Sequence, residues 1–289
     1  MKDFPKISIV TPSLNQGRYL EKTIQSVLSQ NYPNLEYIII DGGSTDGSIE
    51  IIKKYEDQLA YWISEPDRNM YEAIQKGFDK STGEIMAWIN SDDMYFPGAF
   101  EIVAELLNSF KEISWLQGIP AHFDEKGRCV TVFPLRKWSK YDYYTGNYKW
   151  IQQEATFWRR DLWNKAEGMI SRASKIAGDL ELWLHFFRFD KLYVTSALLG
   201  GFRIRSSEQL SLDYGKLYED EAERLIKSEP LAKNEMAKVR EIKHLICLNK
   251  YFVAMRLFIA SRFIIRRIEK LKDYSPVIEF NRFTQSFTI

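Results

Sequence analysis

Residues 38–48 read IIIDGGSTDGS and contain the feature on which the fold assignment depends. An apolar run ends at Asp41, and two glycines and small polar residues follow it. A buried strand that ends in a carboxylate and a loop of small residues has two explanations. Aspartate followed by Gly42 and Gly43 is common turn chemistry. Alternatively, the small loop keeps side chains away from a polar ligand that Asp41 holds.

Short apolar strands and amphipathic helices alternate on both sides of this stretch. The apolar, β-branched character of buried strands occurs at residues 7–11 (ISIVT), 36–40 (EYIII), 61–64 (YWIS) and 84–90 (EIMAWIN). Apolar residues between these runs recur at helical spacing, and Pro97 is placed to open a further helix. This alternation predicts an α/β fold with a mostly parallel sheet and helices on both faces.

Three of the predicted strands end in polar residues. Thr11 and Pro12 end the first strand, Asp41 ends the second, and Asp92 and Asp93 follow the fourth. In an open α/β sheet, ligands bind at the carboxyl ends of the strands. We therefore expect these residues to converge on one binding site, which favours the ligand explanation of Asp41 over an isolated turn.

The carboxylate pair Asp92–Asp93 suggests a divalent cation. Two adjacent carboxylates at the end of a buried strand repel each other and lose hydration. Mg²⁺ or Mn²⁺, with substrate phosphates completing its shell, would relieve both effects. The alternative is structural, because Asp93 could cap the helix that starts near Pro97 or interact with its dipole.

The composition is that of a globular protein without an overall nucleic-acid signal. Of the 289 residues, 45% are hydrophobic, and the formal net charge is +1, so no general attraction to nucleic acid is indicated. Cys129 and Cys247 lie far apart without a CxxC pattern, which predicts neither a disulfide framework nor a zinc site. The chain starts without an apolar signal segment, and no run reaches the roughly 20 apolar residues of a spanning helix. We therefore expect a cytoplasmic protein.

Two long stretches together resemble the family 2 glycosyltransferases of the GT-A fold. They are SIVTPSLNQGRYLEKTIQSVLSQNYPNLEYIIIDGGSTDGS (residues 8–48) and SEPDRNMYEAIQKGFDKSTGEIMAWINSDD (residues 64–93). The resemblance is strong over residues 6–110 and looser through QQEATFWRRDLW, AGDLELWLHFF and GGFRIRSSEQLS. It implies an inverting transferase of the bacterial surface-polysaccharide type. Such an enzyme moves a sugar, here expected to be a hexose, from a nucleotide donor, most often a UDP-sugar, to a saccharide hydroxyl.

The resemblance also implies roles for the residues at matching positions. The implied nucleotide-binding residues are Thr11, Pro12, Asn15, Asp41, Asp67, Arg68 and Asp92. Asp41 would accept hydrogen bonds from the base, most often uracil. Asp93 would hold the divalent cation, Mn²⁺ or Mg²⁺, that bridges the diphosphate. Asp179, in GDLELW, would be the catalytic base; it could also serve as a helix N-cap, and Glu181 is the rival carboxylate.

For the sugars, the resemblance points to Gln153 and Glu154 in QQEATFW. Trp183 could stack on a sugar face, although its helical spacing with neighbouring apolar residues favours a place in the core. Where relatives often carry a histidine near the metal or diphosphate, this chain has Arg205. The arginine fork suits phosphate oxygens but cannot ligate a cation.

We expect a catalytic domain over residues 1–210, with a nucleotide-sugar half over about 1–115 and an acceptor half over about 116–210. Residues 211–289 are expected to form a helical region. A helix over 250–272 would carry an apolar stripe opposite a basic cluster, which suits an anionic membrane surface; the alternative is a helix docked on the catalytic domain. Many bacterial relatives act on lipid-linked saccharides, so the resemblance implies a lipid-linked acceptor at the inner face of the cytoplasmic membrane.

Two other functions stay open at this point. A sugar nucleotidyltransferase would be expected to open with a glycine-rich, basic phosphate loop after its first strand, and PSLNQGRYL is poor for that. A catalytically inactive nucleotide-sugar-binding or scaffold subunit of a glycan assembly complex is disfavoured by Asp93 and Asp179, whereas Arg205 is consistent with it.

Overall fold

The computed structural model describes residues 4–147, 150–170, 174–206 and 215–289. Within these ranges the strands are β1 Ile7–Ser13, β2 Leu35–Asp41, β3 Tyr61–Ser64, β4 Ile85–Trp88, β5 Met94–Tyr95, β6 Trp115–Gln117, β7 Ala121–Phe123, β8 Cys129–Val132, β9 Thr156–Arg159, β10 Tyr193–Thr195, β11 Gly200–Arg203, β12 Val277–Asn281 and β13 Ser286–Thr288. The α-helices are α1 Gly17–Leu28, α2 Ser48–Lys54, α3 Met70–Lys80, α4 Ala99–Ser109, α5 Lys140–Tyr144, α6 Arg160–Lys165, α7 Gly178–Phe189, α9 Gly215–Ser228, α10 Lys233–Ala254 and α11 Phe258–Lys272.

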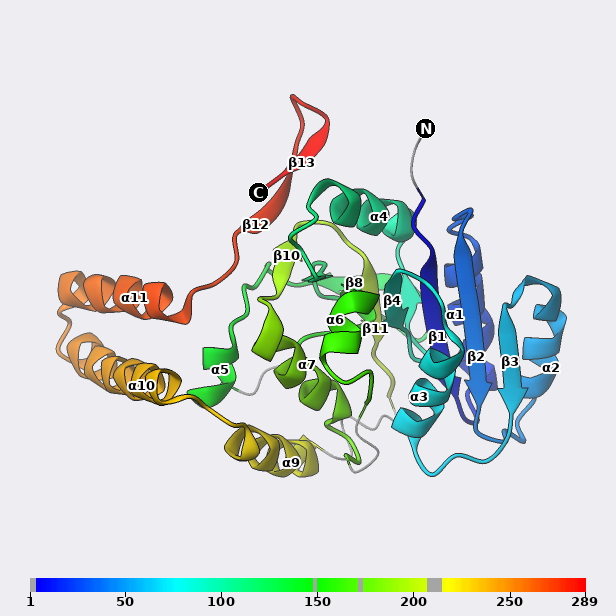
Figure 1. The fold of residues 1–289 in the computed structure, drawn as a ribbon, viewed down its shortest axis with the longest axis horizontal. Helices are drawn as coiled ribbons and strands as arrows, with labels where there is room; N and C mark the ends of the chain where they lie inside the picture. Colours follow the sequence, from blue (N-terminus) through cyan, green and yellow to red (C-terminus); the bar gives the residue numbers. More distant parts are fainter. Residues whose placement is uncertain (1–3, 148–149, 171–173, 207–214) are drawn as a thin grey trace.

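A large sheet in the order β13-β12-β10-β6-β9-β4-β1-β2-β3 runs through the molecule, and helices cover it (Figure 1). A smaller sheet in the order β5-β11-β7-β8 lies beside it. In the large sheet β9 runs antiparallel to both of its neighbours, and β13 runs antiparallel to β12. The remaining neighbours are parallel, which confirms the predicted α/β architecture.

The parallel register brings the polar strand ends together. Ser13 pairs with Asp41 across β1 and β2, and Asp41 pairs with Ser64 across β2 and β3. β4 lies on the other side of β1, and its carboxyl end leads into Asp92 and Asp93. The predicted convergence of these strand ends on one edge of the sheet is therefore confirmed.

An aromatic core fills the space between the sheet and α7. Trp183 lies on α7 and is only 1% exposed. Its ring stacks on Trp88, with centroids 5.7 Å apart, and on Trp115, with centroids 5.6 Å apart. Trp183 therefore packs in the core, as its helical spacing favours, and a sugar contact at Trp183 is not supported.

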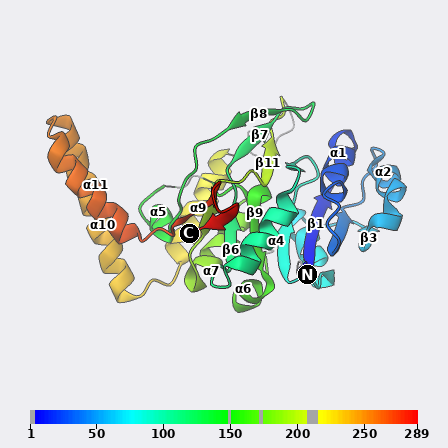
Figure 2. The ribbon, with the colours of Figure 1, turned by 90° about the horizontal axis from the view of Figure 1, so that it is seen from above.

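The C-terminal part differs from its prediction in two ways. The helix expected over 250–272 is interrupted: α10 ends at Ala254, α11 begins at Phe258, and Arg256 between them has a left-handed backbone (φ 59°). The two helices lie side by side as a hairpin that projects from the body (Figures 1 and 2). The chain then returns to the edge of the large sheet as β12 and β13, so residues 211–289 are not only helical.

The segment YVTSALLGGFRI also divides, into β10 of the large sheet and β11 of the small one. β7 and β8 form an antiparallel hairpin, and Gly127 in its turn has the left-handed conformation (φ 83°) that favours glycine. None of the helices in the described ranges is both long and apolar enough to cross a membrane.

Candidate active site

Asp41 holds together the loop that follows β2. Its carboxylate has no exposed surface and accepts hydrogen bonds from the backbone N–H groups of Gly43 (3.1 Å) and Ser44 (2.8 Å). It also accepts from the hydroxyls of Ser44 (2.5 Å) and Ser64 (2.7 Å). Gly43 has φ 86°, a conformation that favours glycine. Both carboxylate oxygens thus hold the loop, as the turn explanation expects. Oδ1 accepts one of these hydrogen bonds, and the predicted hydrogen bond from a base to Asp41 stays a prediction.

The loop after β1 also differs from its prediction in part. Thr11 and Pro12, expected to line the base and ribose, are buried, and the Thr11 hydroxyl lies 3.1 Å from the Tyr37 hydroxyl. Their side chains are enclosed within the strand layer, so direct contact with a nucleotide is not supported. Asn15 is exposed, and its backbone N–H donates to the Ser44 hydroxyl at 2.8 Å. Asn15 therefore links the β1 loop to the β2 loop at the predicted site.

A small surface formed by Leu14, Gly42 and Asp67, beside Asn15, was not predicted from the sequence. Leu14 is 55% exposed, and a Cβ added to Gly42 would lie 3.4 Å from Leu14 Cδ1 and 3.6 Å from Asp67 Oδ2. Asp67 Oδ1 forms an ion pair with Lys76 Nζ at 2.6 Å, while burial raises the pKa of Asp67. The apolar side chain of Leu14 and the carboxylate of Asp67 thus flank Gly42, which has no side chain. The signal that could have found Leu14 is an apolar residue in the polar loop PSLNQG.

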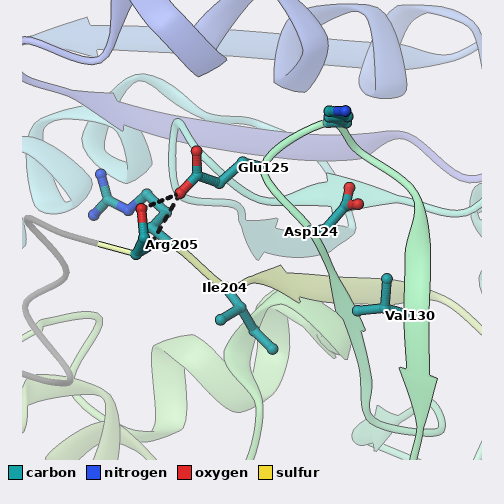
Figure 3. Close-up of a pocket in the computed structure, with 7 residues that line it drawn as sticks. Asp124, Glu125, Val130, Ile204 and Arg205 are labelled. Carbon is teal, nitrogen blue, oxygen red and sulfur yellow. Dashed lines mark hydrogen bonds between the residues drawn. The ribbon is translucent and has the colours of Figure 1, made fainter.

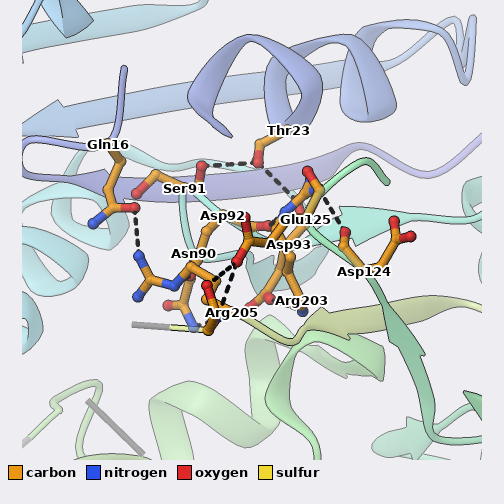
Figure 4. Close-up of polar contacts among 11 residues, drawn as sticks. Gln16, Thr23, Asn90, Ser91, Asp92, Asp93, Asp124, Glu125, Arg203 and Arg205 are labelled. Carbon is orange, nitrogen blue, oxygen red and sulfur yellow. Dashed lines mark hydrogen bonds and ion pairs between the residues drawn. The ribbon is translucent and has the colours of Figure 1, made fainter. Parts of the chain in front are cut away.

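The carboxylate pair predicted to hold a cation lies at the end of β4 (Figure 4). Asp93 has no exposed surface; its Oδ1 accepts from the Arg203 backbone N–H at 2.8 Å, and its Oδ2 accepts from the Asn90 amide at 3.2 Å. Asp92 Oδ2 lies 3.2 Å from Arg205 Nε. Asp92 retains some exposure, so a ligand would reach the pair through Asp92 rather than Asp93.

Four carboxyl groups in this region influence one another. Burial raises the pKa of Asp92, and burial together with the charges of Asp92 and Glu154 raises the pKa of Asp93 well above its usual value. Burial raises the pKa of Glu154 to about 8, with the charges of Asp92 and Asp179 adding to the effect. Burial is also the main cause that raises the pKa of Asp179 to about 7. Glu154 thus links the β4 carboxylates electrostatically to the predicted base.

The pair Asp92–Asp93 fits a hard divalent cation. Among the described residues, no three carboxylate, histidine or cysteine side chains gather closely enough to hold a metal ion by themselves. Burial is the main cause that raises the pKa values of the pair, so a bound cation would favour their charged forms. The buried Asn90 Oδ1 has no hydrogen-bond partner among the described residues. Mg²⁺ and Mn²⁺ are commonly bound by one or two carboxylates, with phosphate oxygens and water completing the shell.

Two arginines of the GGFRIR segment flank this pair, and the sequence drew attention only to the second. Arg203 has no exposed surface; its Nε donates to the Asp92 carbonyl, and its Nη1 donates to carbonyls of the β7–β8 turn at 3.2 Å. Arg205 Nη1 donates to Gln16 Oε1 at 3.1 Å. Both guanidinium groups lie over the Tyr19 ring. Arg203 ends β11 and Arg205 lies two residues beyond it; this two-residue spacing in FRIR, which places side chains of an extended segment on the same face, was the available signal for Arg203.

Gln153 and Glu154, predicted to contact the sugars, form part of a short 3₁₀ helix at the same site. In the part of the chain that the structure describes, both amide atoms of Gln153 and Oε1 of Glu154 are buried without a hydrogen-bond partner. The backbone here packs tightly on β11, since a Cβ at Gly200 would lie 1.9 Å from the Glu154 carbonyl oxygen. Buried polar atoms without partners are costly, so this geometry favours a polar ligand at Gln153 and Glu154.

Asp179 is better placed as a base than its rival. Asp179 lies in the first turn of α7, is partly buried, and its Oδ1 has no hydrogen-bond partner among the described residues. Glu181 instead accepts a hydrogen bond from the Ser174 hydroxyl at 2.6 Å. The predicted nucleotide contact Arg68 is similarly engaged, because its guanidinium pairs with Glu72 at 2.8 Å on the surface.

A cavity of about 400 Å³ extends the site past Arg205 towards the β7–β8 turn (Figure 3). Its lining residues are Asp124, Glu125, Lys126, Val130, Ile204, Arg205 and Ser206. Glu125 closes one part of it by accepting hydrogen bonds from the backbone N–H (2.9 Å) and hydroxyl (2.6 Å) of Ser206. The carboxylate pair and this cavity therefore share Arg205 as a common wall.

The family assignment follows from comparison with known proteins. The family model described as glycosyl transferase family 2 matches residues 8–169, which is more than half of the chain. This chain belongs to the family 2 glycosyltransferases. The matched residues include β1 to β4, the carboxylate pair and the segment of Gln153 and Glu154, so the family resemblance seen in the sequence is confirmed.

Individual relatives agree with this assignment. An uncharacterized glycosyltransferase of Rickettsia typhi is 25% identical over 245 residues, covering 83% of this chain and 77% of that protein. TuaG of Bacillus subtilis, a glycosyltransferase named for teichuronic acid biosynthesis, is 35% identical over 94 residues, covering 32% of this chain and 37% of TuaG. This family 2 glycosyltransferase is therefore an enzyme of the glycosyltransferase class.

The fold has a solved counterpart. The structure of S. aureus TarS residues 1–349 in complex with UDP-GlcNAc matches with a TM-score of 0.66 at 18% identity, over 86% of this chain and 73% of that chain. At this identity the match concerns the fold, and it supports the predicted GT-A-type architecture of this family 2 glycosyltransferase.

Proposed function

We propose that this enzyme is an inverting glycosyltransferase that moves a sugar from a UDP-sugar to a hydroxyl of a saccharide acceptor. The observation that carries the proposal is the separation of two acidic centres in one site. Asp92 and Asp93 lie beside Arg205, where a diphosphate would meet both a cation and a guanidinium. Asp179, on α7, has a pKa raised to about 7 and an oxygen without a hydrogen-bond partner among the described residues, which suits a general base.

The base of the donor would lie at Leu14, Gly42 and Asp67. Leu14 offers an exposed apolar surface, and the missing side chain at Gly42 leaves room for a flat ring. Asp67 would accept a hydrogen bond from the ring N–H of uracil, and Asn15 would lie towards the ribose. The TarS complex contains UDP-GlcNAc, which supports uridine as the nucleoside.

The diphosphate would lie between the β4 carboxylates and Arg205. Asp92 and Asp93 would hold Mn²⁺ or Mg²⁺, which supplies positive charge that makes the nucleoside diphosphate a better leaving group. Arg205 would donate to phosphate oxygens with the part of its fork that faces the adjoining cavity. Arg203 is a positioning residue, because it binds the backbone carbonyl of Asp92 and the carboxylate of Asp93 without reaching the surface.

In the transfer step, Asp179 takes the proton of the acceptor hydroxyl. The acceptor oxygen then forms a bond to the anomeric carbon from the face opposite the diphosphate. The bond between that carbon and the diphosphate oxygen breaks, and its electron pair leaves with the nucleoside diphosphate. A single displacement inverts the anomeric configuration. Gln153 and Glu154 would orient sugar hydroxyls, which would satisfy their buried polar atoms.

The acceptor class is proposed from the relatives. TuaG is named for teichuronic acid biosynthesis, which supports a role in bacterial surface-polysaccharide synthesis with a lipid-linked acceptor. The corresponding place of action would be the cytoplasmic face of the membrane.

Calorimetric titration of the purified enzyme with UDP, GDP and dTDP, with and without Mn²⁺, tests the donor site. We expect UDP to bind most tightly, Mn²⁺ to strengthen binding at least about tenfold, and Asp92→Asn to remove that gain. Glu72→Gln, a surface carboxylate paired with Arg68, is the matched control and should leave UDP affinity within about twofold. Equal affinity for the three nucleotides, or a Mn²⁺ gain that survives Asp92→Asn, would contradict the proposed site.

A further inference from the structure

The turn between α10 and α11 concentrates exposed apolar side chains. Among the described residues, 21 large hydrophobic side chains are exposed, and eight of them fall within residues 251–265. These eight are Tyr251, Val253, Met255, Leu257, Phe258, Ile259, Phe263 and Ile265. Ile259 is 77% exposed and Phe263 is 65% exposed. An apolar cluster of this density on a surface marks an interaction site rather than ordinary surface variation.

The charged residues in and around this segment are all basic. From residue 242 to residue 268 the chain contains Lys243, Lys250, Arg256, Arg262, Arg266 and Arg267, and no Asp or Glu. The whole protein has nearly balanced charges, 40 basic against 39 acidic residues, so this excess is local. Arg267 forms an ion pair with Glu241 at 2.8 Å, towards the base of the hairpin. Lys250, Arg256, Arg262 and Arg266 lie within or next to the apolar segment in the sequence.

The base of the hairpin is tied to the body, whereas its tip projects away. Glu235 at the start of α10 pairs with Lys140 of α5, and Lys272 at the end of α11 pairs with Asp142 of α5 at 2.7 Å. The Ser139 hydroxyl also donates to the Lys272 carbonyl at 2.6 Å. Figures 1 and 2 show the hairpin anchored beside α5 with its turn at the end remote from the sheet. The tip therefore projects from a hairpin base that is fixed to the body of the protein.

We propose that the hairpin tip, residues 250–266, binds the surface of a bilayer that contains anionic lipids. The exposed phenylalanine, isoleucine and leucine side chains would enter the boundary between headgroups and acyl chains. Lys250, Arg256, Arg262 and Arg266 would lie at the level of the anionic headgroups. The alternation of apolar and basic residues around one turn matches this two-layered environment.

A second copy of the chain is the competing occupant of the tip. Two such tips would place like charges against each other, since the tip has no acidic residue to pair with the arginines. Like-charge juxtaposition across an interface is unfavourable. Charge complementarity therefore favours an anionic lipid surface over self-association.

Vesicle flotation with the full-length protein tests the proposal. The probes are vesicles of phosphatidylcholine alone and vesicles of phosphatidylcholine with about 30% phosphatidylglycerol. That share of anionic lipid gives the vesicle a strongly negative surface. The apolar variant is Phe258→Ser, Ile259→Ser and Phe263→Ser, and the charge variant is Arg256→Gln, Arg262→Gln and Arg266→Gln. The matched control is Phe280→Ser with Phe283→Ser, two exposed phenylalanines of the C-terminal strands and the turn between them. UDP binding and sedimentation velocity are measured on every variant.

We expect the protein to bind anionic vesicles and not neutral ones, with binding that falls as salt rises. Each tip variant should weaken binding about 100-fold, while the control pair and UDP affinity stay unchanged. Equal binding by the apolar variant and the unaltered protein would overturn the proposal. So would absence of binding to anionic vesicles, or a concentration-dependent dimer that the tip variants convert to monomer. UDP binding is read separately, so failure at the tip is distinguishable from failure of the proposed donor site.

Discussion

At Asp179, burial places the carboxyl pKa at about 7, and this predicts how activity depends on pH. The folded-state pKa lies above the usual aspartate value, so the group is protonated and inactive as a base below about pH 7. We expect kcat/KM for sugar transfer to fall about tenfold per pH unit below that value. A pH–rate profile, with UDP affinity measured over the same range, checks this. A profile that stays flat down to pH 5 would contradict the assignment.

Single residues also show what the sequence could not supply. The position of Asp41 at a strand end was predictable from hydrophobic patterning, but whether its oxygens face a ligand or the loop depends on Ser44 and Ser64, which lie on different segments. Leu14 and Arg203 were not singled out because exposure and burial are properties of the assembled fold. The sequence left two roles for Trp183, and the stacking of its ring on Trp88 and Trp115 decides for the core.

At the scale of elements, α9 supports the start of α7. Glu221 of α9 is 4% exposed, and its carboxylate accepts hydrogen bonds from the backbone N–H groups of Lys175 (3.0 Å), Ile176 (3.0 Å) and Ala177 (3.2 Å). These three residues immediately precede the first turn of α7, where Asp179 lies. We therefore propose that Glu221 acts on the reaction indirectly, as a positioning residue for the segment that carries the proposed base.

Removal of this support should separate catalysis from donor binding. We expect Glu221→Ala to lower kcat about 10- to 100-fold and to leave UDP affinity within about twofold, because the donor site lies on other elements. Glu223→Ala, on the same helix and exposed, is the matched control and should leave kcat unchanged. Assays are run well below the melting temperature of each variant. A parallel loss of kcat and UDP affinity would indicate general destabilisation and contradict the positioning role.

The elements themselves were predictable where periodicity was strong. The run YWIS coincides with β3, and the apolar spacings identify α1, α3 and α7. Such patterns are visible in the sequence because the buried side of a helix or strand recurs at a fixed residue spacing. The break at Arg256 escaped prediction because apolar residues continue through the turn without a proline or glycine. β12 and β13 escaped it because short edge strands depend on a partner strand that is distant in sequence.

At the scale of the whole molecule, one sheet joins both ends of the chain. β3 lies at one edge, and β12 and β13 from the C-terminus lie at the other. The main sheet therefore includes strands from both sides of the predicted domain boundary at residue 210. Figure 1 shows that the α10–α11 hairpin is an excursion between two strands of that sheet. The proposed lipid-binding tip is in this way coupled to the same framework that carries the site.

Asp179 is proposed to drive sugar transfer from a UDP-sugar bound at Asp92 and Asp93. The most direct measurement is the release of UDP from UDP-GlcNAc and other UDP-sugars, comparing the unaltered enzyme with Asp179→Asn and with Glu181→Gln as the matched control. We predict that Asp179→Asn lowers turnover about 10³-fold with UDP affinity unchanged, and that Glu181→Gln retains turnover within about fivefold. Turnover that survives in Asp179→Asn would contradict the account, as would UDP binding by the unaltered protein without turnover of any UDP-sugar.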